Sequence, residues 1–268
     1  MLSEVPATQT AIIQYHGGSL KITSGLPVPE LEPHHVLVRT ASVALNPCDF
    51  KMPMRFPTPG LWDGCDFSGF SVLFKDLINL TRPRALIMVK LCGHRVIAAC
   101  SLKNFDLVRS YGADLVFDYN SKTCAQDIRT ATKNTLRYAL DPFAEAKTLI
   151  LCQEAIGRTG GRYCALEQYQ EHLCARKTVK NDLVMGGAIS GNGVQLPEPY
   201  GIPPRPEIGT WARSWYKTVQ RLIDDGKLKP SPVRLLPGRF EGIIEGLKML
   251  KEGTISGQKL VVLLENAA

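Results

Sequence analysis

Ser101, Lys103 and Asn104 form the cluster with the clearest chemistry in the sequence. They offer a hydroxyl, an ammonium and an amide, which suit a phosphate group by charge and hydrogen bonding. At this position of a dinucleotide-binding fold, an Asp or Glu binds the ribose 2′-hydroxyl of NAD, whereas such donors favour the 2′-phosphate of NADP. A plain strand-to-helix loop with Ser101 as the helix N-cap accounts for the same residues.

The elements around this cluster predict a strand, a helix and a second strand. Val96 to Cys100 is a short apolar run, and a segment with helical periodicity follows from Phe105 to the Tyr-Gly pair at 111–112. Residues 115–117 form another short apolar run. Short apolar strands that alternate with helices indicate βαβ units and a parallel sheet. Ligands bind at the carboxyl ends of such strands, which is where the polar cluster lies.

The composition is typical of a soluble globular enzyme. The chain has 268 residues, 44% hydrophobic and 21% charged, which is enough for one large domain or two small ones. Its 32 basic and 25 acidic residues give a net charge of +7 that is spread along the chain. This pattern predicts a solvated surface suited to an anionic cofactor or acyl-carrier partner, and no nucleic-acid footprint. No segment has 18 uninterrupted apolar residues, so we expect no membrane span.

The N-terminus and the cysteines favour a cytoplasmic protein. The first ten residues contain no apolar stretch, so no secretory signal is expected. Eight cysteines are scattered without a CxxC pair, which predicts reduced, mostly buried thiols. Cys48, Cys65 and Asp66 lack the spacing of a zinc site, so no metal is expected. There is no GxSxG motif either, and a weak catalytic signature is compatible with a reductase, whose cofactor carries the chemistry.

The rest of the chain supplies further elements. Two compact motifs, NPCDFK at 46–51 and GCDFSG at 64–69, have turn chemistry and are expected to be loops, facing a cleft or purely structural. The glycine-rich segment at 190–193 is expected to be a substrate-side loop or a plain turn. Residues 194–205, with four prolines, are expected to be an extended loop. The other predicted elements are a hairpin over 8–14 and 19–23, strands over 35–45, 136–141, 162–166 and 259–264, an apolar run over 183–189, and helices over 84–91, 125–133, 144–156, 211–225 and 240–251.

The first half of the nucleotide-binding unit is missing from the sequence. Such a unit needs a strand and then a glycine-rich turn before its first helix, so that the backbone can approach the pyrophosphate. No GxGxxG or equivalent precedes the helix expected at 84–91, and residues 70–82 show no clear partner pattern. We therefore expect no phosphate cradle.

Several blocks together resemble the medium-chain dehydrogenase/reductases, and specifically the trans-acting enoyl reductases of fungal polyketide synthases, the lovastatin type. NPCDFK resembles their NPxDxK loop, and GCDFSG resembles their G-[TC]-D-[YF]-[AS]-G turn. CSLKNFDLVRSYGADLVFDY is similar to their adenosine-binding region, and NTLRYALD, AIGRTGGRY and SGQKLVVLLE match later blocks. The resemblance covers about 8–59 and 84–265. It implies an α/β fold, with a Rossmann-like parallel sheet in a cofactor domain at 83–229 and a reduced GroES-like β-rich domain at 1–82 and 230–268.

The resemblance also implies a function. It predicts a cytoplasmic, zinc-independent reductase that uses NADPH to reduce a carrier-bound polyketide, with a polyketide synthase as its partner, alone or as a hybrid with a peptide synthetase. Asn46 stands where zinc-dependent relatives have a Cys ligand, and Cys65-Asp66 stands where they have His-Glu. No catalytic acid or base is assigned. The residues predicted to line the substrate are Met185, Gly186, Gly187, Ala188, Ile189 and Ser190. Those predicted to contact the cofactor are Cys48, Asp49, Phe50, Lys51, Ser101, Leu102, Lys103, Asn104, Tyr119, Ser256, Gly257 and Lys259.

The length of the chain leaves an alternative open. Two domains of about 150 residues each would need a chain near 300. The expected loss lies between Gly69 and Arg84, where the family has its first Rossmann strand and glycine-rich turn. The adenosine end of the site is kept, but the pyrophosphate and nicotinamide ends are damaged. The alternative is a non-redox remnant of the family that acts as a synthase-interaction protein or a repurposed cyclase.

Overall fold

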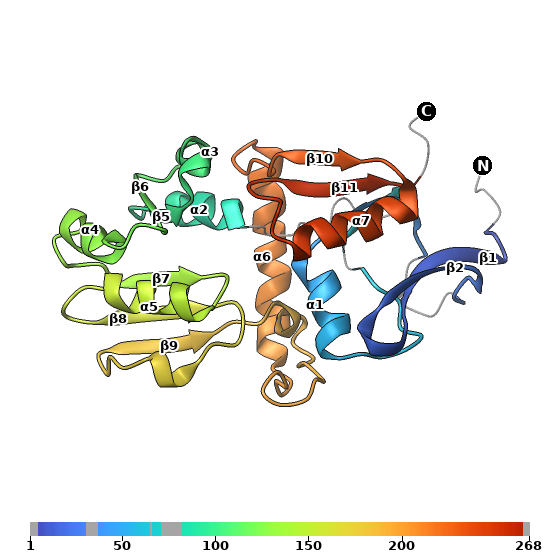
Figure 1. Cartoon of the computed structure of the whole chain (residues 1–268), viewed down its shortest axis with the longest axis horizontal. Helices are drawn as coiled ribbons and strands as arrows, with labels where there is room; N and C mark the ends of the chain where they lie inside the picture. Colours follow the sequence, from blue (N-terminus) through green and yellow to red (C-terminus); the bar gives the residue numbers. More distant parts are fainter. Residues whose placement is uncertain (1–4, 31–36, 65, 71–81, 265–268) are drawn as a thin grey trace. The chain divides into compact units, whose positions relative to one another are not determined.

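The computed structural model describes residues 5–30, 37–64, 66–70 and 82–264 (Figure 1). The chain divides into two compact units, which we describe separately. The terminal unit comprises residues 1–80 and 231–268, and the central unit comprises residues 81–230. The expected loss between Gly69 and Arg84 falls mainly on residues 71–81, which lie outside the described residues. The α/β class with parallel sheets is confirmed.

The terminal unit contains an antiparallel hairpin and a four-stranded sheet. The predicted hairpin is confirmed as β1 (Thr8–Gln14) and β2 (Leu20–Pro27), joined through the short 3-10 turn His16–Gly18. The sheet has the order β10-β11-β3-β4. Its strands are β3 (Arg39–Ala44), β4 (Phe67–Phe70), β10 (Val233–Leu236) and β11 (Lys259–Leu263), and its helices are α1 (Pro47–Arg55) and α7 (Arg239–Lys251).

The core of the terminal unit lies between β11 and α7. Leu260 and Val262 alternate along β11 and are fully buried, as expected for one face of a strand. Gly246 lets α7 approach this face, because a side chain there would overlap Leu45 and Leu236. The buried cluster consists of Ile12, Leu45, Ile243, Leu247, Leu260 and Val262.

The central unit contains two separate parallel sheets. One pairs β5 (Ile97–Cys100) with β6 (Leu115–Asp118). The other has the order β7-β8-β9 and consists of β7 (Tyr138–Asp141), β8 (Gly161–Ala165) and β9 (Val179–Leu183). Figure 1 draws these strands in the order β6, β5, β7, β8, β9. The helices are α2 (Arg82–Leu91), α3 (Phe105–Ser110), α4 (Cys124–Ala131), α5 (Ala146–Ala155) and α6 (Pro206–Asp224), with 3-10 turns at Leu102–Asn104, Glu171–Leu173 and Gly186–Ser190.

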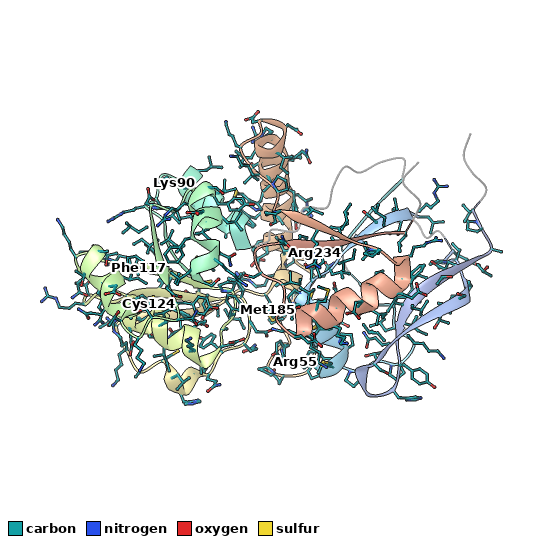
Figure 2. All side chains as sticks on the ribbon, turned by 45° about the horizontal axis from the view of Figure 1, so that its top comes forward. Arg55, Lys90, Phe117, Cys124, Met185 and Arg234 are labelled. Atoms are coloured by element: carbon teal, nitrogen blue, oxygen red, sulfur yellow. The ribbon has the colours of Figure 1, made fainter. Side chains whose placement is uncertain are left out.

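Two buried clusters hold the central unit together. Leu149, Ile156 and Tyr163 are fully buried between α5 and the β7-β8-β9 sheet. The second cluster joins the two sheets, since Cys124 and Ile128 of α4 pack with Ala155 of α5 and with side chains from both sides. Ile97 of β5, Phe117 of β6 and Leu136, two residues before β7, are part of it. Figure 2 labels two of its members, Phe117 and Cys124.

Several sequence predictions need correction. NPCDFK is not a loop but opens helix α1, because Asn46 is the N-cap, Pro47 the first helical residue and Asp49 the partner in a capping box. Strands β4, β9 and β10 were not predicted: the strand near the apolar run at 183–189 is Val179–Leu183, and most of that run is the 3-10 turn Gly186–Ser190. Helix α6 begins at Pro206 instead of Trp211. The prediction of mostly buried thiols is wrong, because among the described cysteines only Cys124 is buried, Cys48 and Cys92 are exposed, and the others are partly buried. Within the described residues, no helix is both long and apolar enough to cross a membrane.

Candidate cofactor-binding site

The predicted adenosine-end residues lie together at the carboxyl ends of β5 and β6. Cys100 pairs with Asp118 in the ladder, and the Tyr119 N–H donates to the Cys100 carbonyl at 3.4 Å. Ser101 and Tyr119 are therefore neighbours, each following the last residue of its strand. The register of the parallel pair brings them together, because parallel strands end at the same edge of their sheet.

A tight turn presents the polar side chains of this cluster. The Asn104 N–H donates to the Ser101 carbonyl at 2.9 Å, and the Asn104 Nδ2 donates to the Ser101 Oγ at 3.1 Å. Ser101 occupies the N-cap position of the 3-10 turn, but its side chain makes no capping hydrogen bond. Leu102 and Lys103 are exposed. The turn thus leaves an ammonium group in solvent beside a hydroxyl and an amide.

Lys147 is a second cation at this edge that the sequence reasoning missed. It lies in the first turn of α5, and its Nζ is 5.3 Å from the centroid of the Tyr119 ring. The same Nζ donates to the Asn120 Oδ1 at 3.3 Å. A cation over an aromatic face is attracted by the ring quadrupole. The only sequence signal for Lys147 is its place at the start of the helix after β7.

This donor set fits the adenosine end of a nucleotide with a 2′-phosphate. The residues 101–104 after β5 provide a hydroxyl, an amide and an ammonium, which suit a phosphate, and the carboxylate at this edge is that of Asp118 at the end of β6. Burial, and then the neighbouring Asp118 carboxylate, raise the pKa of Cys100, so its thiol stays protonated and adds no charge. For the pyrophosphate end, the sequence contains no glycine-rich turn ahead of α2, so no described group can be assigned to it.

The predicted residues of the NPCDFK motif surround the N-terminus of α1 in the terminal unit. Asp49 is buried, and its Oδ2 accepts a hydrogen bond from the Asn46 N–H at 2.7 Å. Asp49 is therefore occupied in holding the start of the helix. Cys48 and Lys51 are exposed, and the Cys48 Sγ lies 3.5 Å from the Asp49 Oδ1. Phe50 lines a hollow of about 250 Å³ that Met54, Ile244 and Leu247 also line.

Lys259 connects the last strand to this helix. Its Nζ donates to the Asp66 Oδ2 at 2.9 Å and also to the Asn46 Oδ1. The Asn46 Nδ2 donates to the same Asp66 oxygen at 2.8 Å. Lys259 and Asp66 expose only 14% and 12% of their side chains, so this is a largely buried ion pair. Ser256 and Gly257 precede it in the turn before β11.

An ammonium therefore lies beside the positions that carry metal ligands in zinc-dependent enzymes of the resembled family. Asp66 accepts hydrogen bonds from Lys259 and Asn46, and Cys65 lies outside the described residues. Among the described residues, no group of three His, Cys, Asp or Glu side chains could hold a metal ion. Nearby, burial and then the Asp49 carboxylate raise the pKa of Asp63 from 3.8 to about 7.

The predicted substrate segment is a 3-10 turn that lies against α6. Met185, labelled in Figure 2, precedes this turn, which spans Gly186–Ser190. The Ser190 Oγ donates to the Gly187 carbonyl at 3.3 Å and accepts from the Asn192 N–H at 3.2 Å. Gly209 of α6 packs directly on Ser190, since a side chain there would overlap the Ser190 carbonyl. The segment is thus a supported turn at the end of the β7-β8-β9 sheet.

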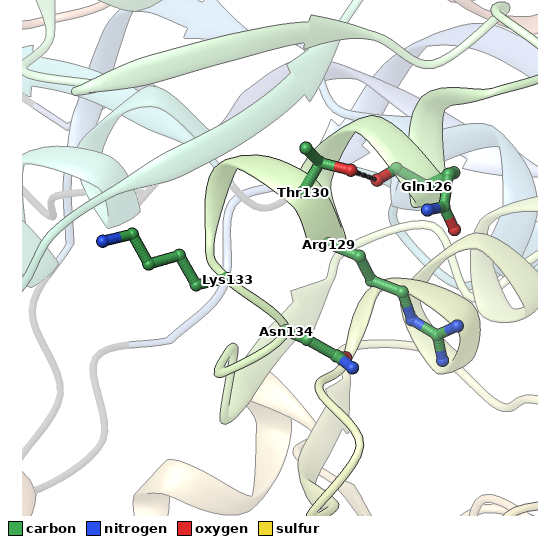
Figure 3. A pocket seen from close by; sticks show the side chains of 5 residues that line it. All are labelled: Gln126, Arg129, Thr130, Lys133 and Asn134. Atoms are coloured by element: carbon green, nitrogen blue, oxygen red, sulfur yellow. Dashed lines mark hydrogen bonds between the residues drawn. The ribbon is translucent and has the colours of Figure 1, made fainter.

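A pocket on α4 contains none of the predicted site residues. It measures about 280 Å³, and Figure 3 shows the polar side chains around it. A hydrogen bond from the Thr130 Oγ1 to the Gln126 carbonyl, drawn there, is internal to the helix. We do not assign the cofactor to this pocket, because it lies on the outer surface of α4 and not at the end of a strand. Its lining residues are Gln126, Arg129, Thr130, Lys133 and Asn134.

Known proteins similar to this chain are enoyl reductases. The enoyl reductase cheB of Chaetomium globosum is 42% identical over 362 aligned residues, covering 98% of this chain and 96% of the relative. A trans-enoyl reductase of Pyricularia oryzae is 39% identical, covering 97% of this chain and 99% of the relative. Since 362 aligned positions exceed the 268 residues of this chain by 94, at least 94 positions of the first relative have no counterpart here. No protein-family model matches the chain.

Solved structures with the same fold are also oxidoreductases. A protein named as a probable oxidoreductase from Mycobacterium abscessus superposes with a TM-score of 0.69 at 14% identity, covering 97% of this chain and 100% of the other. The CurK enoyl reductase superposes with a TM-score of 0.64 at 12% identity, covering 95% of this chain and 98% of the other. At these identities the likeness shows the fold alone.

Proposed function

This chain belongs to the fungal trans-enoyl reductases, within the medium-chain dehydrogenase/reductases, and we propose that it reduces an enoyl thioester with NADPH. The observation that carries the choice of cofactor is the cluster after β5 and β6. Ser101, Lys103 and Asn104 supply phosphate donors without a carboxylate, and Tyr119 lies beside them. This set favours a 2′-phosphate over a free 2′-hydroxyl.

The residues of this chain would bind and orient the reactants. When bound, NADPH supplies the hydride for the β-carbon of the enoyl thioester, and a proton is added at the α-carbon. Lys103 and Lys147 provide positive charge for the 2′-phosphate, and Ser101 and Asn104 provide hydrogen bonds. We assign Cys48 to Lys51, Ser256, Gly257 and Lys259 to the cofactor in the terminal unit, and Met185 to Ser190 to the acyl chain.

We further propose that the substrate is carried by a polyketide synthase in the cytoplasm. A reductase that acts in trans needs an acyl chain delivered by a separate carrier domain, and the net charge of +7 suits an anionic carrier surface. A hybrid with a peptide synthetase remains one form of this partner. The names of the relatives support the reductase over the non-redox alternative.

The test is a single-turnover assay on the purified full-length chain. The substrate is an enoyl pantetheine thioester. NADPH or NADH is added, and the mass of the product is measured by mass spectrometry. We expect slow formation of the saturated thioester, faster with NADPH than with NADH. Lack of saturated product at every NADPH concentration would overturn the proposal.

A further inference from the structure

In the part of the chain that the structure describes, the two parallel sheets of the central unit correspond to one doubly wound sheet whose first strand is not among the described strands. Such sheets have the order 3-2-1-4-5-6. In the described part of the unit, β6 and β5 take positions 3 and 2, and β7, β8 and β9 take positions 4, 5 and 6. Position 1, between β5 and β7, holds no described strand. The sheet is divided at this position, and the cluster of Cys124, Ile128 and Ala155 connects the two parts.

The hydrogen-bonding pattern identifies which backbone groups face this position on β5. The carbonyls of Val96 and Cys100 accept bonds from the β6 side, at 3.3 Å from Leu115 and 3.4 Å from Tyr119. Successive residues of a strand direct their backbone groups to opposite sides in a parallel ladder. The peptide groups of Ile97 and Ala99 therefore point away from β6.

The same reasoning applies to β7. The Arg137 carbonyl accepts from the Arg162 N–H at 2.7 Å, and the Asp141 carbonyl accepts from the Leu166 N–H at 3.1 Å. The peptide groups of Tyr138 and Leu140 therefore point away from β8. Tyr138 and Leu140 are 70% and 46% exposed as whole residues, although they belong to a strand that a complete sheet would place in its interior.

We propose that the edges of β5 and β7, which the described residues leave unpaired, form a docking site for one extended, apolar β-strand supplied by another polypeptide. The occupant runs parallel to both strands, because β5 pairs with β6 in parallel, β7, β8 and β9 pair in parallel, and a doubly wound sheet is mostly parallel. It is apolar, because a parallel strand in such a sheet is buried on both faces and Tyr138 and Leu140 lie exposed beside the opening. Adding a strand to an exposed edge is an established mode of peptide recognition.

The length of the relatives supports this choice of occupant. At least 94 positions of the Chaetomium globosum protein are absent from this chain, and the helix that follows strand 1 in such folds is present as α2. The probe is therefore a peptide with the sequence of one segment of the relative. This segment comes immediately before the helix of the relative that corresponds to α2. It supplies backbone hydrogen bonds to both edges and side chains for the uncovered apolar surface.

Hydrogen–deuterium exchange of the full chain with and without this peptide tests the proposal. We expect saturable protection of the amides of Ile97, Ala99, Tyr138 and Leu140. A peptide with N-methyl groups on alternate amides, which cannot donate on one side, is the matched control and should protect weakly. The proposal would be overturned if these four amides were already protected in the chain without peptide. It would also be overturned if no peptide concentration protected them.

Two variants locate the binding site on the edges. Ala99→Pro and Leu140→Pro each remove one edge N–H without removing a bond to β6 or β8, and proline is tolerated at a strand edge. Each should weaken peptide binding about fivefold, the equivalent of about 1 kcal/mol for one backbone hydrogen bond. Unchanged affinity in both folded variants would contradict the proposal. Concentration-dependent dimerisation of the chain with protection of the same amides would show that a second copy pairs there instead, and would also contradict it.

Discussion

Replacing Lys103 with glutamate should change the cofactor preference of this chain. Lys103 is exposed in the turn after β5. Its hydrogen bond to a 2′-phosphate is therefore taken at the lower end of the energy range for charge-assisted hydrogen bonds. Losing one charge-assisted hydrogen bond costs roughly 1.5 kcal/mol. A new repulsion between unit charges about 4 Å apart in water adds about 1 kcal/mol. The total of about 2.5 kcal/mol corresponds to an increase of about 70-fold in the Kd for NADPH.

The matched measurement uses NADH, which lacks the 2′-phosphate. Its Kd should change by less than about threefold, because only a screened long-range charge effect remains. Both constants can be obtained by nuclear magnetic resonance titration, which tolerates weak binding. Lys217→Glu, on the exposed face of α6, makes the same change in net charge and should leave the NADPH to NADH ratio unaltered. An equal loss for both cofactors in Lys103→Glu would refute the assignment of Lys103 to the 2′-phosphate.

Three further predictions concern affinity, stability and pH. NADPH should bind to this chain at least about a hundredfold more weakly than to a relative with a glycine-rich turn, because two or three charge-assisted hydrogen bonds to the pyrophosphate are lost. A micromolar Kd measured by nucleotide fluorescence would contradict this prediction. Lys259→Met should destabilise the terminal unit by about 3 kcal/mol in urea unfolding, because it removes the Lys259 ammonium from its largely buried ion pair with Asp66. Adding Asp66→Asn should recover most of that loss. The pKa of the Asp63 carboxyl is raised from 3.8 to about 7, so the folded chain binds the proton of this carboxyl more tightly than the unfolded chain does. The stability that this proton contributes is therefore lost as the pH rises from about 4 to 7. Asp63→Asn should flatten that loss, and an unchanged pH profile of unfolding would exclude Asp63 as its source.

Local sequence patterns predicted the central unit well. The strand, helix and strand predicted around Ser101 are present as β5, α3 and β6. This prediction succeeded because short apolar runs and helical periodicity depend only on neighbouring residues. The NPCDFK motif was misinterpreted, although Asn-Pro-x-Asp carries both an N-cap and a capping-box partner. The residue types that form turns also cap helices, so this signal is ambiguous without the structure.

Contacts between distant residues could not be predicted from such patterns. Lys259 and Asp66 are 193 residues apart, and nothing in the local sequence indicates that their side chains pair. Lys147 reaches Tyr119 from the start of a different helix, so its place beside the adenosine-end cluster depends on how α5 packs. Strand β10 has only four residues, Val-Arg-Leu-Leu, which do not alternate between apolar and polar, and three of them are exposed. The roles of all predicted site residues in cofactor and substrate binding stay predictions.

The division of the sheet and the missing phosphate cradle have one physical origin. In a dinucleotide-binding unit the glycine-rich turn continues directly from strand 1 into the first helix, so a chain without that strand also lacks the turn. Among the described residues no strand pairs with these edges of β5 and β7, and Tyr138 and Leu140 of β7 are exposed. Exposed, unpaired strand edges with apolar side chains tend to pair with other chains. A strand that fits both edges would therefore remove this tendency, and only a strand that carries the glycine-rich turn would also bring back the backbone N–H groups that pyrophosphate needs.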